Sequence, residues 1–341
     1  MCSFRCLRKT AAERPRPNSP QPLVHPVHGA LDELVWPSPG AASGEGLAFG
    51  AVRSVEKRRG LVGRYAVHRH PTARVSPALG LGSGGPVGAL FHGAMMGTFL
   101  VMGRLFPRVE GQAIVNRDLV FNMVNGVALF GLRVTAITAV ASAIDIGVLA
   151  TDWIQGGWLQ GIVAFLMLDF SRYWLHYAGH RVPFLWQFHR VHHSAEVLDA
   201  STGLRMHVVD FIQLSALPIV LFGVLFDTSG WHPAVLPVVL SIGVFFDTFQ
   251  HSNIRIDPRA RWFRAWNVLF NNPLFHSWHH CRDGHLRDGN YSNTLIVWDR
   301  LFGTDVTGPE PPPLYGVMEG EALVNDPLSW QTLRTRARTG S

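Results

Sequence analysis

Three histidine clusters in the second half of the chain have the spacing of metal ligands. They are His176-x3-His180, His189-x2-His192-His193 and His276-x2-His279-His280. Residues three or four apart share one face of a helix, so each cluster can direct two or three imidazoles toward one point. Eight converging imidazoles would repel one another if protonated and would leave ring nitrogens without partners if neutral. A bound metal removes both problems, and we therefore predict a metal site.

The number of imidazoles indicates more than one ion. Eight ring nitrogens exceed the four ligands of a structural zinc site and suit two ions with room for an exogenous ligand. Imidazole binds zinc, copper, iron and nickel, so the ligand type does not select the metal. The clusters contain no HExxH, the motif that supplies the base of many zinc proteases. Twelve of the 17 histidines lie between residues 176 and 285, which places the chemistry in that part of the chain.

Long apolar stretches must position these clusters. Four stretches have at most two charged residues each, namely 87–103, 119–150, 153–168 and 211–246. A membrane-spanning helix needs about 20 mostly apolar residues, and the last stretch is long enough for two if 227–232 is a turn. Pro218, Pro233 and Pro237 favour a kinked or re-entrant pair. A soluble core could contain any one stretch, but four together predict an all-α, polytopic membrane bundle of about four to five apolar helices.

Arginines mark one side of this predicted bundle. They flank the first two stretches and follow the third and the fourth: Arg104, Arg108, Arg117, Arg172, Arg181, Arg190, Arg205, Arg255, Arg259, Arg261 and Arg264. Counting the crossings puts all of these regions on one side, which the positive-inside rule makes cytoplasmic. We therefore expect an integral, multi-pass protein with a cytoplasmic helical cap that carries the histidine clusters. A spanning segment at 87–103 would conflict with this orientation, because it would put the basic N-terminal residues outside.

The positive charge of the chain is confined to its first 85 residues. Residues 1–85 have 12 basic and 5 acidic side chains, whereas residues 86–341 have 18 and 19. The Pro and Gly clusters of residues 1–85 favour a disordered tail. A solvated tail explains the arginines there more simply than an arm that binds nucleic acid. We expect no nucleic-acid partner. The predicted parts are the tail (1–85), a membrane domain (86–305) and a Pro-rich C-terminal extension (306–341).

The order HxxxH, HxxHH, HxxHH, with apolar hairpins between the clusters, resembles the fatty acid hydroxylase superfamily, the sterol desaturase-type membrane di-iron oxygenases. The similarity extends over roughly residues 115–305. RVPFLWQFHRVHHS (181–194) resembles the segment around the second histidine box, and WDRLFGT (298–304) resembles the C-terminal signature. LRMHVVD (204–210) is similar to an RxHPxE element and FQHSNI (249–254) to a later lone-histidine element. Three positions depart from the family pattern: Val208 replaces Pro, Asp210 replaces Glu, and Ser292 replaces the Gly of NxG.

The resemblance implies an enzyme with two iron ions and O2 as co-substrate. Its ligands would be the eight clustered histidines, with His207 and His251 at the positions of further metal-site histidines: His176, His180, His189, His192, His193, His207, His251, His276, His279 and His280. The implied reaction is hydroxylation or desaturation of an unactivated C–H bond of a lipid or sterol-like substrate. The sequence has no haem, flavin or nicotinamide motif, so the two electrons would come from a separate donor of ferredoxin or cytochrome type.

The same histidines would also suit two alternative functions. One is a zinc-dependent membrane hydrolase or lyase, and the other is a non-enzymatic membrane metal carrier. A carrier should place ionisable residues within its spans, whereas these clusters follow the apolar stretches.

Two aspartates could orient the ligands. Asp169, seven residues before His176, is either an acceptor for the first cluster or a charge at a helix end, and Asp210 could orient His207. We expect neither His232 nor His285 to bind metal.

Overall fold

The computed structural model describes residues 86–113, 115–143, 147–308, 312, 314–324 and 326–335. In these segments the chain is helical, and its β pairing is limited to isolated bridges. The predicted all-α class is confirmed. The predicted N-terminal tail lies outside the described residues.

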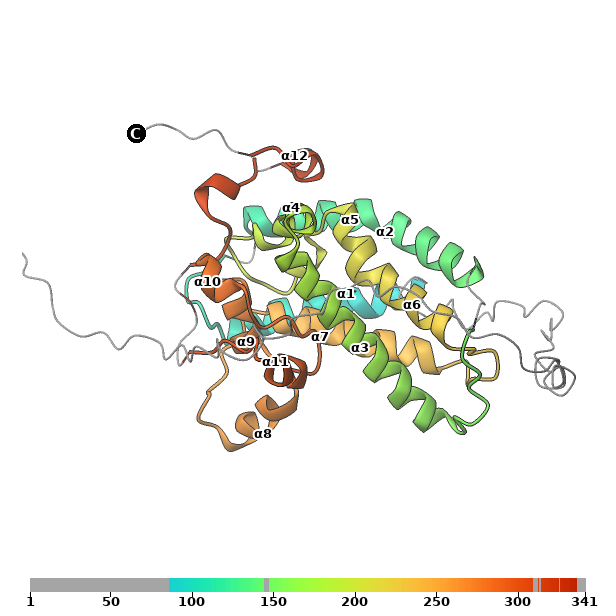
Figure 1. The fold of residues 1–341 in the computed structure, drawn as a ribbon. Helices are drawn as coiled ribbons and strands as arrows, with labels where there is room; N and C mark the ends of the chain where they lie inside the picture. The colour runs from blue at the N-terminus through green and yellow to red at the C-terminus, as the bar shows by residue number, and fades with distance from the viewer. Residues whose placement is uncertain are drawn as a thin grey trace, which may run out of the picture. The chain divides into compact units, whose positions relative to one another are not determined.

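Apolar helices form a bundle in which distant parts of the sequence lie side by side (Figure 1). These helices are α1 (Pro86–Leu105), α2 (Arg117–Ala143), α3 (Gly157–Arg181), α6 (Leu217–Leu225) and α7 (Val235–His251). Helix α3 packs against α6 and α7, and α1 covers another side of α7. The apolar stretch at 153–168 forms only the first half of α3, so that the same rigid helix extends from the bundle core to the first histidine cluster.

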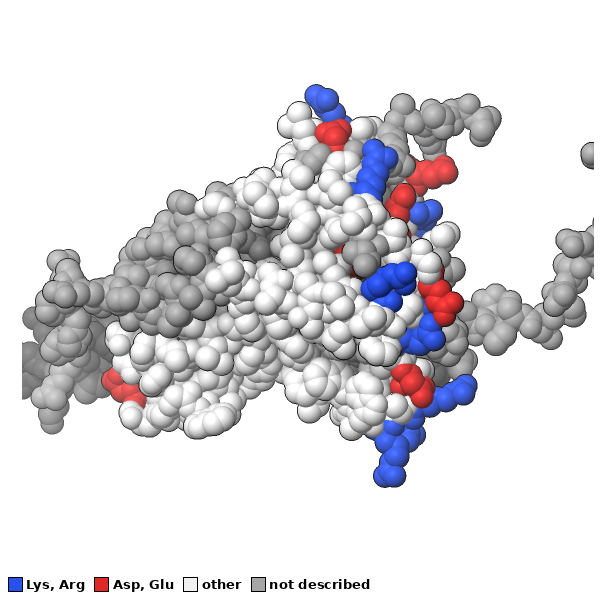
Figure 2. Space-filling model, turned by 180° about the vertical axis from the view of Figure 1, so that it is seen from behind, with Lys and Arg blue, Asp and Glu red and all other residues white. Residues whose placement is uncertain are grey.

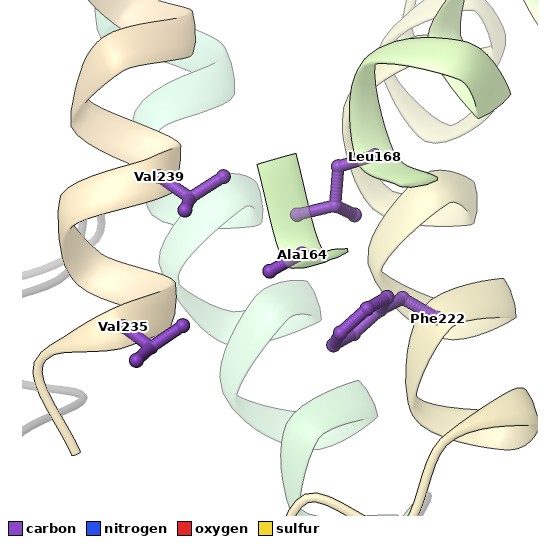
Figure 3. Packing of buried hydrophobic residues seen from close by; sticks show 5 residues of the cluster. All are labelled: Ala164, Leu168, Phe222, Val235 and Val239. Atoms are coloured by element: carbon purple, nitrogen blue, oxygen red, sulfur yellow. The ribbon is translucent and has the colours of Figure 1, made fainter. Parts of the chain in front are cut away.

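A cluster of buried apolar side chains joins three of these helices. Ala164 and Leu168 of α3, Phe222 of α6, and Val235 and Val239 of α7 are buried against one another (Figure 3). Each four-residue spacing places both side chains on one helix face, and Ala164 has no bulk beyond Cβ to hold the neighbouring helices apart.

The fourth apolar stretch forms an interrupted helix, a loop and α7. The helix consists of α5 (Val208–Phe211), the π-helical segment η3 (Ile212–Ala216) and α6. Pro218 lies in the first turn of α6, directly after η3. A proline inside a helix lacks the N–H donor and collides with the carbonyl four residues earlier, and a π-helical turn accommodates both effects. Residues 226–234, which include the turn expected at 227–232, then lead into α7.

One helical run in the described part of the chain is long and apolar enough to cross a bilayer. It is Val208–Leu225, with a mean hydropathy of 2.1, and a third of its residues are buried by the rest of the chain. Val235–His251 is also apolar but has fewer than 18 residues. The number of spans, four to five, therefore remains a prediction.

Short helices gather at the end of the bundle where α3 and α7 finish (Figure 1). They are α4 (Pro183–His193), η2 (Thr202–Leu204), α8 (Arg261–Leu269), α9 (Pro273–His279), α10 (Gly284–Arg287), α11 (Val297–Phe302), η4 (Glu319–Glu321) and α12 (Pro327–Thr332). Proline begins both α4 and α9, where its missing N–H costs nothing. Asn272 caps α9 by accepting hydrogen bonds from the N–H groups of Leu274 and Phe275.

Candidate metal centre

Nine histidines form two groups at the end of the bundle that carries the short helices. The five-histidine group contains His176, His180, His189, His193 and His279, and the four-histidine group contains His192, His251, His276 and His280. Within each group, one ring nitrogen of every residue lies within 4.8 Å of those of the others. All nine are buried except His176, which is partly buried. The structure therefore brings together all three predicted clusters and His251.

Each HxxHH cluster contributes to both groups. The first gives two histidines to the five-histidine group and one to the four-histidine group, and the second does the reverse. On α4, His189 and His193 are four residues apart and enter the five-histidine group, while His192 enters the other. His276 of α9 and its four-residue partner His280, which directly follows the helix, enter the four-histidine group. His279 enters the five-histidine group. Adjacent residues of a helix point about 100° apart, so a His-His pair reaches two centres at once.

Six of the nine histidines have Nδ1 against an oxygen that lies outside their group. The acceptors are backbone carbonyls for four residues and carboxylates for two: Tyr291 O for His176, Arg205 O for His192, Asp247 O for His251, Gly289 O for His279, Asp288 Oδ1 for His180 and Asp210 Oδ1 for His189. A carbonyl or an ionised carboxylate can only accept, so Nδ1 carries the proton and Nε2 keeps its lone pair. This is how metal-ligating histidines are held in proteins.

One short loop supplies three of these acceptors. Asp288, Gly289 and Tyr291 hold His180, His279 and His176, respectively, all from the five-histidine group. Asn290 lies between them with φ at 58°, in the left-handed region that asparagine tolerates better than most residues. Its side chain donates to Phe275 O and accepts from the N–H of Val306, and these bonds fix the loop.

In each group, two inward-pointing Nε2 atoms lie so close together that they would repel each other if neither carried a proton. Those of His176 and His189 lie 3.0 Å apart in one group, and those of His192 and His251 lie 3.2 Å apart in the other. Because all four residues carry their proton on Nδ1, each contact brings two lone pairs together. In addition, buried Nε2 atoms of His180, His279 and His280 have no hydrogen-bond partner in the described structure. A cation in each group satisfies these nitrogens, so the residues present fit a bound metal.

The histidines of α4 and α9 are held in the neutral form that binds metal. Burial lowers the pKa of His193, His279 and His280 well below its ordinary value, and neighbouring imidazoles lower it further. Neutral imidazole is the ligating species, so these residues need not lose a proton at neutral pH when metal binds.

Residues 161–304, which include all nine histidines, match the family model described as fatty acid hydroxylase. This segment is similar to the fatty acid hydroxylase family. The resemblance predicted from the histidine spacing is thus confirmed.

Three relatives show how far the similarity reaches. The chain is 32% identical to alkylglycerol monooxygenase of Homo sapiens over 145 residues, 41% of the chain and 29% of that protein. It is 31% identical to ornithine lipid hydroxylase OlsE of Rhizobium tropici over 158 residues, 45% of the chain and 43% of that protein. It is 29% identical to fatty acid hydroxylase vlmA of Lecanicillium sp over 150 residues, 41% of the chain and 40% of that protein. The aligned region is less than half of each relative. No solved structure matches the chain.

His207 lies outside both groups. It caps α5 by accepting a hydrogen bond at Nδ1 from the N–H of Val209, and its Nε2 donates to Gln331 O. Its ring packs against Phe188. Both ring nitrogens are thus engaged by the protein, and the ligand role expected for His207 remains untested.

The two aspartates differ from their expected roles. Asp210 faces His189, at 2.9 Å from Nδ1, and not His207 as expected. This occurs because His207 caps α5 while Asp210 lies in its first turn and points toward α4. Among the described residues, Asp169 forms no hydrogen bond or ion pair with a histidine. It accepts from the N–H groups of Thr294 and Leu295 and from Trp298, and so ties α3 to the segment before α11.

The two histidines expected to be outside the site lie apart from both groups. His232 is exposed in the loop before α7, and His285 is exposed on α10.

A cavity of about 110 Å³ connects the two histidine groups with the apolar part of the bundle. His176, His189, His192, His251 and His276 line one end of it. The other end is lined by apolar side chains of η3, α6 and α7, namely Leu214, Ile219, Leu240 and Val244. A hydrocarbon segment in this cavity would therefore lie next to the histidines.

Sequence reasoning missed three polar residues of this site. Asp288 and the loop carbonyls have no recognisable spacing relative to the histidines. Arg172 and Asp247 also line the cavity, and each precedes a site histidine by four residues. That helical spacing was a signal that could have found them.

Proposed function

We propose that this chain is a membrane-bound two-iron monooxygenase that hydroxylates or desaturates an unactivated C–H bond of a lipid. The two electrons would come from a separate ferredoxin- or cytochrome-type donor. The observation that carries the proposal is the pair of Nε2 contacts, one in each histidine group, that bring lone pairs within 3.2 Å. The similarity of residues 161–304 to the fatty acid hydroxylase family supports iron over other metals that imidazole binds. The names of two relatives, alkylglycerol monooxygenase and ornithine lipid hydroxylase, support a lipid substrate.

The proposed ligands are the nine residues of the two histidine groups. His207 is left out because hydrogen bonds occupy both of its ring nitrogens. When bound, the irons would supply O2 activation and the abstraction of hydrogen from an unactivated carbon. The protein would supply orientation: Asp210, Asp288 and the loop carbonyls keep the Nε2 lone pairs directed inward. The apolar end of the cavity would hold the hydrocarbon and exclude water from the reacting carbon.

The surface supports a position within a membrane. The charged side chains seen in Figure 2 gather at the end that carries α9 and α10 in Figure 1, and most of the remaining described surface in that view has none. Large apolar side chains are exposed along the bundle, including Leu90 (73%) and Val127 (77%). Trp153, in the loop before α3, and Trp158, in the first turn of α3, are exposed, as is typical of a membrane–water interface. With the arginine-rich loops inside, the histidine groups of the 86–305 membrane domain would face the cytoplasm.

The reaction can be tested with purified protein in lipid nanodiscs. Iron-loaded protein, a chemical reductant and oxygen-18 gas are combined with a lipid extract, and the lipids are analysed by mass spectrometry. The proposal predicts a product that contains one oxygen-18 atom, or a product that has lost two hydrogens with O2 consumed in proportion. Hydrolysis or lyase products from zinc-loaded protein, with no oxygen uptake after iron loading, would favour the zinc enzyme. Metal transport into liposomes without any change in the lipids would favour a carrier.

A further inference from the structure

Two opposite charges line the cavity one helical turn away from the histidine groups. Arg172 precedes His176 by four residues on α3, and Asp247 precedes His251 by four residues on α7. Residues four apart share a helix face, separated by a rise of about 6 Å. Because α3 and α7 pack together, the histidines form one layer of the cavity lining. Arg172 and Asp247, one cation and one anion, form the next layer.

Neither charge is neutralised by direct contact. Among the described residues, no hydrogen bond or ion pair engages the guanidinium of Arg172 or the carboxylate of Asp247, although the two charges attract one another at longer range. The carboxylate of Asp169, which also attracts Arg172, is occupied by backbone N–H groups and Trp298. Ionisable groups in an apolar bundle are costly to keep without partners, so such residues usually serve a ligand.

Two glycines leave room for these charged groups. A Cβ atom on Gly243 would lie 2.7 Å from a terminal guanidinium nitrogen of Arg172. A Cβ atom on Gly203 would collide with a carboxylate oxygen of Asp247. Any larger residue at either position would displace the charged group that lines the cavity.

We propose that Arg172 and Asp247 bind the headgroup of the lipid substrate, and that this headgroup is uncharged and bears hydroxyls. A hydroxyl oxygen accepts from Arg172 while a hydroxyl hydrogen is donated to Asp247. An anionic headgroup would face Asp247 as a like charge, and a cationic headgroup would face Arg172 in the same way. A zwitterion would require the desolvation of two further charges.

This assignment rests on the proposed function and limits where the lipid is oxidised. A rise of about 6 Å corresponds to roughly five carbon–carbon bonds of an extended chain. The oxidised carbon therefore lies close to the headgroup and not in the middle of the chain.

Binding to metal-free protein tests the headgroup site separately from the chemistry. Radiolabelled 1-O-hexadecylglycerol, hexadecanoate and hexadecane are titrated into wild type, Arg172→Gln, Asp247→Asn and Gly243→Ala in detergent micelles. Arg255→Gln, which changes an exposed arginine paired with Glu110, is the matched control. Wild type and control should prefer the diol-headed lipid, and each of the other variants should bind it about 10- to 100-fold more weakly while binding hexadecane unchanged. Gly243→Ala keeps both charges, so its loss of affinity cannot come from an unpaired buried group.

Two results would overturn the assignment. One is equal affinity of wild type for the three lipids, or a preference for hexadecanoate. The other is unchanged affinity of Arg172→Gln and Asp247→Asn for the diol-headed lipid. Monooxygenase activity together with either result would leave the proposed function intact and remove only the headgroup site.

Discussion

The imidazole rings of His193 and His280 stack with centroids 4.5 Å apart and planes inclined by 22°, although the two residues belong to different histidine groups. His193 is the four-residue partner of His189, and His280 is that of His276. The five- and four-histidine groups therefore contact each other directly through these two stacked rings, with no helix between them. Metal ions held by the two groups would be neighbours in one centre, and a change in either group is expected to affect the other.

Asp210 should control the metal affinity of the five-histidine group. Its buried carboxylate accepts the Nδ1 proton of His189 at 2.9 Å. Asp210→Leu removes this acceptor and should weaken metal binding about 10- to 100-fold, as measured by competition with a chelator. Asp210→Asn keeps an oxygen acceptor and should have a smaller effect.

Asp288→Asn is the matched comparison for Asp210. Its carboxylate is 37% exposed and lies 3.4 Å from Nδ1 of His180, so its hydrogen bond is longer and more accessible to water. A larger loss of metal affinity in Asp288→Asn than in Asp210→Asn would contradict the importance assigned to the buried pair.

Replacing Asn290 by alanine should lower the free energy of unfolding more than replacing it by glycine. At a φ of 58°, any residue with a Cβ and no local hydrogen bond is strained, whereas glycine is not. Asn290→Ala also loses the bonds to Phe275 and Val306, and should lower the free energy of unfolding by about 3 kcal/mol. Asn290→Gly should lower it by about 1 kcal/mol less than alanine does. Chemical unfolding in micelles measures both values, and an alanine variant as stable as the glycine variant would show that backbone strain is not important there.

Asp299 should make the stability of the metal-free protein depend on pH. Burial raises the pKa of Asp299 from 3.8 to about 6, although the N–H groups of Tyr291 and Ser292 donate to its carboxylate. The folded chain thus binds this proton more tightly than the unfolded chain does. The resulting stability is fully present below pH 3.8 and is lost as the pH rises to about 6.

Asp299→Asn cannot titrate and supplies the reference. The free energy of unfolding of wild type minus that of the variant should fall by about 3 kcal/mol between the unfolded and folded pKa values. A difference that increases with pH over that range would mean that the N–H donors outweigh burial.

Helix α8 should lie in the membrane surface. Trp262 and Leu269, seven residues apart on one face, are 63% and 47% exposed, while Phe263 is buried against the protein. Arg261 and Arg264 can reach lipid phosphates from the same helix. A spin label introduced through Trp262→Cys in liposomes should be relaxed by oxygen more than by a water-soluble nickel complex. The matched label at Glu196→Cys should show the reverse, and a water-accessible label at residue 262 would refute the interfacial position.

The sequence was sufficient to predict the helical class and the convergence of the three clusters. Both follow from local rules: apolar stretches of helical length, and histidines three or four residues apart that share a face. His251 has no such local signal, and the resemblance of its FQHSNI segment alone marked it.

The division of the histidines and their partners could not be predicted in the same way. Whether His192 or His193 faces a given centre depends on how α4 is rotated about its axis, which tertiary packing decides. Three of the six Nδ1 acceptors come from the loop at 288–291, and two of these are backbone carbonyls that leave no trace in a sequence motif. Asp210 was assigned to its sequence neighbour His207, but the fold places it beside His189 on another helix.

The central claim is that each histidine group holds one metal ion, and the most direct measurement is the iron content of purified, iron-loaded protein. We predict about two iron ions per chain for wild type and for His285→Ala, whose exposed imidazole belongs to neither group. His192→Ala removes a ligand of the four-histidine group and should lower the content while abolishing lipid oxidation. Wild type with a single iron or none, or equal losses in His192→Ala and His285→Ala, would contradict the two-metal centre.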